Sequence, residues 1–266
     1  MIYDLQKASL IKRFSAFLLD FILLAIVFTG AMMGVSSLTN YDSHFSSLES
    51  RLTEIQEKYN IPEIEKAYEV SFNEFQYMMD DEKALLDPVV LDAYTKCTEE
   101  MNSDSATIKF YETIMNLSML IISLSMLIAF LILEFFIPLL FKNGQTIGKK
   151  IFSIAVMRND GVKISPMILF VRAILGKYTV GTMVPIMMIL MLLFGSSPIV
   201  SIAVVLLIFL IQVILLLTSK KRSLIQDYLS STVVVDFQSQ MIFDSVEDKQ
   251  EYQLRIHKEE ADKAPY

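Results

Sequence analysis

Residues 12–38 read KRFSAFLLDFILLAIVFTGAMMGVSSL, a basic pair followed by an apolar run that is long enough to cross a bilayer. The run contains one acidic residue, Asp20. An ionised aspartate at the centre of a spanning helix costs about 2.5 to 3.5 kcal/mol on insertion scales, so an acid here indicates a functional site. Arg13 lies seven positions earlier, about 10 Å along a helix axis, which is too far for a direct pair. We therefore expect both residues to find partners on other helices.

Apolar residues make up 53% of the 266 residues and gather in long blocks instead of recurring at amphipathic spacing. Each of four blocks is close to the 17 to 25 residues that a spanning helix needs. They predict an all-α membrane protein with four transmembrane helices at residues 14–38, 114–141, 178–194 and 199–218. The first block is longer than the apolar core of a signal peptide and has no convincing cleavage motif, so we expect an uncleaved helix.

Basic residues orient the predicted bundle. They precede the first span, follow the second and follow the fourth, for example at Lys12, Lys150 and Lys221. Because lysine and arginine favour the cytoplasmic side of a membrane, both chain termini are predicted to be cytoplasmic in a multi-pass protein of the cell membrane. The net charge of −7 comes largely from the segment between the first two spans and from the tail, and it gives no support to a nucleic-acid partner.

Residues 39–112, between the first two spans, are acidic and are predicted to lie outside the cell as a helical insertion. Apolar residues recur there at steps of three and four (Phe45, Leu48, Leu52, Ile55, Tyr59), Pro62 suits a helix start, and the pattern continues through Tyr68, Phe75 and Met79. These features predict a small helical bundle. Its acidic outer face is either a solvated surface or a site for a cation or a protein partner. We expect Cys97, the single cysteine, to be solvated, with pairing to another chain as the alternative.

A second intramembrane acid, Glu134, is predicted at the depth of Asp20. It lies eight residues before Lys142, about 12 Å into the membrane, and Asp20 lies about 10 Å in. If the first two spans are neighbours, the two acids could share a proton or hold a cation, with Arg172 as the nearest counter-charge. Alternatively, Glu134 hydrogen-bonds a neighbouring helix for packing alone. Arg13 is expected to pair with Asp227, close to the inner surface.

The segment after the second span predicts a small cytoplasmic β-hairpin. Residues 151–157 have strand composition, 159–161 are a strong turn signal, 162–164 form a second short strand, and 232–235 could add a third. Gly144 and Gly148 do not form a phosphate loop, because Lys150 stands where Ser or Thr is required. The predicted domains are the first helix (1–38), the insertion (39–112), a core (113–236) and a polar cytoplasmic tail (237–266).

Several of these features together resemble one family. They are the spacing of Arg13, Ala16 and Asp20, the acid Glu134 ahead of the GQTIGKK motif (Gly144, Gln145, Thr146, Gly148, Lys149), and the QDYLSSTVVV stretch that contains Asp227. The chain resembles the RDD family of bacterial membrane proteins over residues 8–38 and 113–236. Its name refers to one arginine and two aspartates, which by position match Arg13, Asp20 and Asp227. Two departures are the long insertion and Gln226, where histidine is common.

The resemblance implies a membrane protein that takes part in cation/proton exchange, as some members do, or that serves as a membrane partner of other proteins. Our leading hypothesis is a transporter subunit with Asp20 and Glu134 as ion-carrying acids and an Arg13–Asp227 clasp. Four spans are few for a transport path, so a homo-oligomer is expected. The alternative is a non-transporting assembly protein that binds a partner through the insertion. No enzyme, cofactor or metal site is expected, because the predicted spans contain neither His nor Cys.

Overall fold

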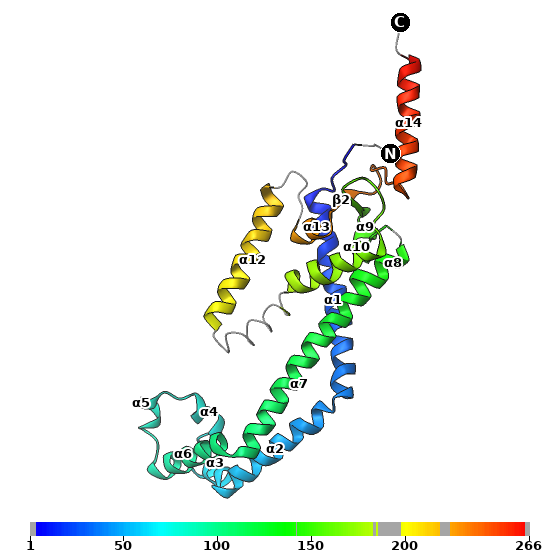
Figure 1. Ribbon diagram of the computed structural model, residues 1–266. Helices are drawn as coiled ribbons and strands as arrows, with labels where there is room; N and C mark the ends of the chain where they lie inside the picture. The colour runs from blue at the N-terminus through cyan, green and yellow to red at the C-terminus, as the bar shows by residue number, and fades with distance from the viewer. Residues whose placement is uncertain (1–3, 142, 183–184, 186–197, 219–223, 264–266) are drawn as a thin grey trace. The chain divides into compact units, whose positions relative to one another are not determined.

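The computed structural model describes residues 4–141, 143–182, 185, 198–218 and 224–263. The chain is mostly helical, as predicted, and its two named strands form a small antiparallel sheet. It divides into two compact units, which we call the core unit (residues 1–31 and 123–266) and the insertion unit (residues 32–122). In the core unit, short helices and the sheet gather around the first turns of α1 (Leu10–Leu38) (Figure 1).

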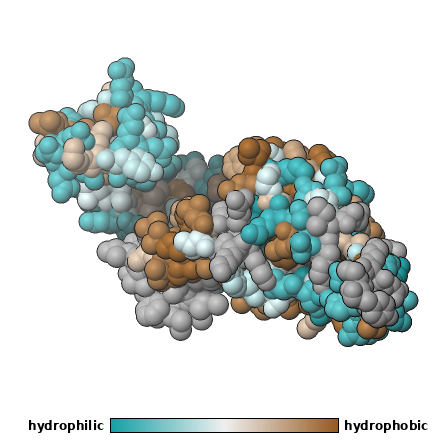
Figure 2. Space-filling view, turned by 90° about the horizontal axis from the view of Figure 1, so that it is seen from above, coloured by the Kyte–Doolittle hydropathy of each residue, from teal (hydrophilic) through white to brown (hydrophobic). Residues whose placement is uncertain are grey.

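Two helical stretches among the described residues are long and apolar enough to cross a membrane. One is α1, and the other runs from Ser105 to Phe141 through α7 (Ser105–Phe130), η1 (Leu131–Phe136) and α8 (Ile137–Phe141). The core helix of a soluble protein buries most of its apolar side chains, whereas α1 leaves many exposed, including Phe14, Phe17 and Ile26. Figure 2 shows such hydrophobic areas on the surface beside hydrophilic ones. These helices are suited to contact with lipid.

The remaining predicted spans are described only in part. α12 (Pro198–Thr218) coincides with the predicted fourth span and exposes large apolar side chains such as Phe209 and Leu217. Of the predicted third span, 178–194, only residues 178–182 and 185 are among those described. Residue 142 and the basic residues 220–222, which contributed to the predicted orientation, also lie outside them.

The predicted β-hairpin is confirmed only in part, because the segment at 232–235, predicted as a possible third strand, makes most of the pairing. β1 (Ile154–Arg158) pairs with β2 (Thr232–Asp236), with Val156 opposite Val234. Residues 162–164 supply only isolated bridges, and the predicted start of the first strand, Ile151, instead ends the helix α9 (Ile147–Ile151). β1 is buried on both faces and needs an apolar partner strand. The run of three valines in β2 supplies one, whereas the nearer segment places Lys163 at its centre.

Short helices complete the core unit. α10 (Pro166–Val171) leads directly into η2 (Arg172–Gly181), a segment of the wider π type, and α13 (Ile225–Leu229) packs against η2. The polar tail forms α14 (Val246–Lys263), whose side chains are mostly exposed.

The insertion unit is built from five helices: α2 (Tyr41–Lys58), α3 (Ile61–Tyr68), α4 (Phe72–Tyr77), α5 (Asp80–Lys83) and α6 (Pro88–Ser103). They enclose an apolar core of Ile55, Ile61, Phe72, Phe75, Val90, Tyr94, Cys97 and Met101. The predicted pattern of apolar residues at steps of three and four is correct at Leu48 and Ile55, which are buried. Phe45 and Met79, which belong to the same pattern, are exposed. Cys97 is fully buried, so the expectation of a solvated thiol is wrong. It lies three residues after Tyr94, on the inner face of α6.

A charged contact joins two helices of this unit. The guanidinium of Arg51 in α2 donates to both carboxylate oxygens of Asp104, at 3.1 and 3.0 Å. Asp104 also accepts from the backbone N–H of Thr107 at 2.8 Å, as a residue that caps a helix start does. The hydrogen bonds from Arg51 and Thr107 hold the pKa of Asp104 well below its usual range.

The buried thiol provides a test of this core. Burial raises the pKa of Cys97 to about 11, so thiolate is scarce at neutral pH and maleimide labelling requires local opening. Tyr94→Ala removes a fully buried ring and its 2.6 Å hydrogen bond to the carbonyl of Val70. A loss above about 1.4 kcal/mol raises the open fraction at least about tenfold. We expect labelling to accelerate accordingly in Tyr94→Ala, measured by mass spectrometry of the full chain. The control Tyr77→Ala alters an exposed ring and should label at the wild-type rate.

Candidate functional site

Among the residues that the structure describes, the hydrogen-bond donors to the Asp20 carboxylate lie in the GQTIGKK motif and are uncharged. Its Oδ1 accepts from the backbone N–H of Gly148 at 2.8 Å, and its Oδ2 accepts from the hydroxyl of Thr146 at 2.5 Å. Both donors lie at the start of α9, where backbone N–H groups have no partner within the helix. The carboxylate is therefore satisfied by two fixed donors, and it fastens α1 to α9.

The motif residues each have an identifiable structural role. Gly144 adopts a left-handed conformation, with φ of +59°. Gln145 donates its side-chain amide to the carbonyl of Ile154 at 2.8 Å, and Thr146 caps α9. At Gly148 a Cβ atom would lie only 2.3 Å from the carbonyl oxygen of Ala16. Only glycine allows α9 to approach α1 this closely.

Asp227 lies at the centre of a buried charged network. Its Oδ1 pairs with Nη1 of Arg172, and its Oδ2 lies 3.7 Å from Nη2 of Arg13. Arg172 also donates to the hydroxyl of Thr232 at 2.5 Å. The Arg13–Asp227 pair predicted from the sequence is present. The prediction that Arg172 faces Asp20 or Glu134 is wrong, because packing of α13 on η2 brings Asp227 to Arg172 instead.

Glu134 pairs with Lys177, whereas the hydrogen bonds of Asp20 come from Thr146 and Gly148. Glu134 belongs to η1 and Lys177 to η2, and the two segments are in contact. Pro138 has no N–H to donate to the carbonyl of Glu134, and Ile137 donates instead to Ile132, five residues back. The turn around Glu134 is therefore wider than an α-helical turn, a feature often found at functional sites. The predicted carboxylate pair fails because each acid has donors of its own.

Lys149, in α9, adds a further cation to this region. Partial burial and repulsion by Lys177 lower its pKa to about 7, although Glu134 and Asp20 act in the opposite direction. We call the following residues the charged cluster: Arg13, Asp20, Glu134, Lys149, Arg172, Lys177 and Asp227. With every group in its usual charged form, its four cations and three acids leave a net charge of +1.

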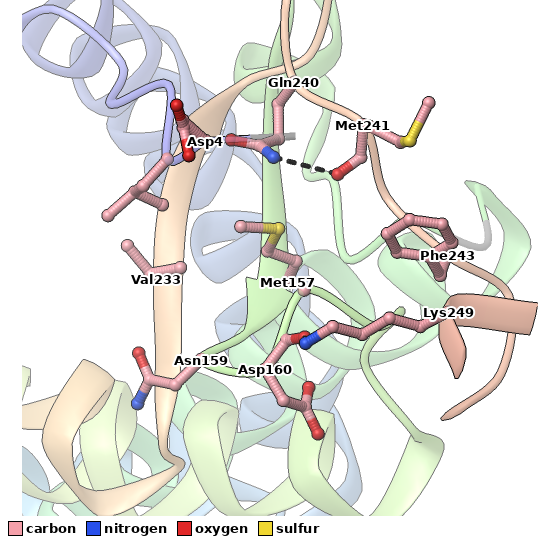
Figure 3. Close-up of a pocket in the computed structure, with 11 residues that line it drawn as sticks. Asp4, Met157, Asn159, Asp160, Val233, Gln240, Met241, Phe243 and Lys249 are labelled. Carbon is pink, nitrogen blue, oxygen red and sulfur yellow. Dashed lines mark hydrogen bonds between the residues drawn. The ribbon is translucent and has the colours of Figure 1, made fainter. Parts of the chain in front are cut away.

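A hollow with a volume of about 210 Å³ lies beside the sheet (Figure 3). Met157 and Val233 form part of its lining. Two of its polar side chains bond within the chain: Lys249 donates to the carbonyl of Asp160 at 2.5 Å, and Gln240 donates to the carbonyl of Met241 at 2.9 Å. In the described part of the chain, no group of three or more His, Cys, Asp or Glu residues could hold a metal ion. The charged cluster is the stronger candidate site.

The sequence did not identify three contacts in this region. Lys177, like Glu134, is a charged residue within an apolar stretch of sequence. The sequence does not show that their two helical segments are neighbours, so the pair was not predicted. Lys12 pairs with Asp236 at 2.5 Å, across almost the whole length of the chain. Gly176 gives space to α13, since a Cβ atom there would lie 2.4 Å from Cβ of Gln226.

Comparison with known proteins gives one match. A model of the RDD family matches residues 7–231, a range that contains every residue of the charged cluster. No curated protein and no solved structure matches the chain.

The close approach at Gly148 can be tested by adding one methyl group. In Gly148→Ala, the new Cβ collides with backbone of α1 and with the Asp20 carboxylate. Such overpacking costs about 1 to 3 kcal/mol, so the thermal unfolding temperature of the purified protein should fall. Gly30→Ala is the control, because a Cβ at residue 30 meets nothing within 4 Å. Equal unfolding temperatures for the two variants would refute the close contact.

The buried network gives a second test. Asp227→Asn leaves Arg172 buried with an uncompensated charge, which destabilises a protein by about 3 to 5 kcal/mol. The double variant Arg172→Met with Asp227→Asn removes that charge and should recover part of the loss. Thermal unfolding of the single and double variants measures the difference. If the double variant were less stable than Asp227→Asn, the stranded charge would not be the cause.

Proposed function

Because the chain belongs to the RDD family, we propose that it is a multi-pass membrane protein that exchanges protons for a small monovalent cation at the Glu134–Lys177 pair. Its family and its long apolar helices make it a membrane protein. The exchange is supported above all by one observation, a carboxylate in a long apolar helix whose partner is an amine. A small cation could replace that amine at the carboxylate.

The other two acids of the charged cluster, Asp20 and Asp227, are bound by groups that a cation would displace less readily. Asp20 accepts from a backbone N–H and a hydroxyl, and Asp227 pairs with two guanidinium groups, which stay charged at any physiological pH. An ammonium can lose its proton when buried. Glu134 is therefore the acid best suited to alternate between an internal partner and a transported cation.

This proposal changes the role of Asp20. In place of an ion carrier, Asp20 becomes a positioning residue that holds α9, and with it Lys149, against α1. Arg13, Arg172 and Asp227 fasten α13 to η2 and to the start of α1. Loss of Asp20 would then disturb exchange through the placement of α9.

The finer topology belongs to the same proposal. We propose four spans, cytoplasmic termini, a place in the cell membrane, an insertion unit outside the cell and no catalytic activity. Exchange through so few helices also calls for a second copy of the chain, so the proposed transporter is a homo-oligomer in the lipid bilayer. The distribution of basic residues along the sequence supports the proposed orientation in the membrane.

A role as an assembly protein is the second candidate, and the insertion unit favours it. This unit has an apolar core of its own, and its outward-facing residues are rich in Asp and Glu. Deletion of residues 42–108 should then abolish binding of a protein partner, measured by co-purification from membranes. Under the transport proposal, the same deletion leaves the charged cluster intact.

The transport proposal predicts that Glu134→Gln abolishes exchange, since a neutral amide can neither bind the cation nor release Lys177 in return. The assay uses proteoliposomes with an internal pH dye and an imposed sodium or potassium gradient. Glu112→Gln, an exposed acid on the other stretch of the same long helix, is the matched control and should transport normally. Equal fluxes for wild type and Glu134→Gln would refute the assignment.

A further inference from the structure

We propose that Lys149 is the proton-binding residue of the charged cluster, and that a proton on Lys149 and a monovalent cation at Glu134 occupy the cluster alternately. The alternation rests on the proposed function. The proposal that Lys149 binds a proton depends only on the arrangement of the charged cluster.

The backbone at Lys149 is held in place from two sides. The preceding residue, Gly148, donates its N–H to Asp20 and approaches the carbonyl of Ala16 too closely for any side chain. Thr146 bonds to Asp20 as well, and it accepts from the N–H of Lys149 at 3.4 Å. The contact between α9 and α1 therefore fixes the backbone from which the Lys149 side chain extends.

Charged groups on three other elements face Lys149: Asp20 from α1, Glu134 from η1, and both Arg172 and Lys177 from η2. Within the described residues, the structure gives the Lys149 ammonium no carboxylate within ion-pair distance, whereas Glu134 is already paired with Lys177. The two guanidinium groups of the cluster cannot release a proton at physiological pH. Lys149 is thus the cation that the cluster can neutralise most easily.

The charges of the cluster connect the proton to the cation. With Lys149 protonated, four cations and three acids leave a net charge of +1. When the Nζ of Lys149 gives its proton to water, the cluster becomes neutral, and binding of one monovalent cation at Glu134 restores +1. Because surplus charge is unfavourable in a poorly solvated site, proton and cation should exclude each other.

The sign of the pH dependence follows from the lowered pKa of Lys149, about 7. Below pH 7 the amine carries its proton and opposes a second cation. Above pH 7 it is neutral and the cation can bind. Apparent cation affinity should therefore rise about tenfold per pH unit up to about pH 7 and then level off.

Competitive labelling of lysines directly tests whether Lys149 binds the proton. Full-length protein in nanodiscs is treated with limiting acetic anhydride between about pH 5 and about pH 9, and acetylation is read by mass spectrometry. Lys149 should show an inflection near pH 7, which Glu134→Gln shifts to lower pH because a stabilising negative charge is lost. Lys150, adjacent and exposed, is the internal control and should not respond to Glu134→Gln. A Lys149 profile without an inflection between about pH 6 and about pH 8 would overturn the proposal.

Binding of radioactive sodium to the purified protein tests the alternation. Wild type should follow the pH dependence above, Lys149→Met should bind equally at every pH, and Lys149→Arg should bind weakly throughout because its charge is permanent. If Lys149→Met kept the wild-type pH dependence, another residue would be the proton acceptor and only the role of Lys149 would fail. If Lys149 titrated but wild type bound neither sodium nor potassium, the proposed exchange would fail, and with it the alternation.

Discussion

The capture of Asp20 by the start of α9 is the contact on which the rest of the core unit depends. A carboxylate within an apolar helix has no water to solvate it, so the chain itself must supply its hydrogen bonds. Thr146 and Gly148 supply them, which fixes α9 against α1. The chain then continues into β1, whose Ile154 packs with Ala16 of α1 in the same apolar cluster. One half-buried acid thereby connects α1 to the motif that leads into the sheet.

The three acids of the cluster show how the chemistry of a partner determines what an ion pair can do. A guanidinium offers several donors in a fixed plane and keeps its charge, so the Arg172–Asp227 pair behaves as a permanent fastening. The ammonium of Lys177 is a single, mobile donor group, and its partner Glu134 lies where the helix is locally widened. In the proposed function, stability and exchange thus depend on different pairs within one network.

Part of this arrangement could be predicted from the sequence. Long apolar blocks and isolated charges within them are local features, and they identified the long helices, Asp20, Glu134 and the Arg13–Asp227 pair. Apart from the Arg13–Asp227 pair, partners set by packing between distant segments could not be predicted. Arg172 was assigned to the wrong acid because the position of α13 on η2 depends on contacts such as that of Gly176 with Gln226. The hairpin was only partly right for a similar reason, since a turn signal at 159–161 does not show that β1 pairs more extensively with a strand some seventy residues later.

The contacts between residues 8–13 and residues 227–236 have a consequence for biosynthesis. Lys12 pairs with Asp236, Ala8 donates to the carbonyl of Val234, and Arg13 reaches Asp227. The first helix leaves the ribosome long before these partners exist, so its basic start lacks these contacts until residues 227–236 have been translated. The insertion unit, whose core lies within residues 55–101, can form much earlier. A ribosome that stalls before residue 227 would therefore carry a chain with a folded insertion unit and an unfinished core.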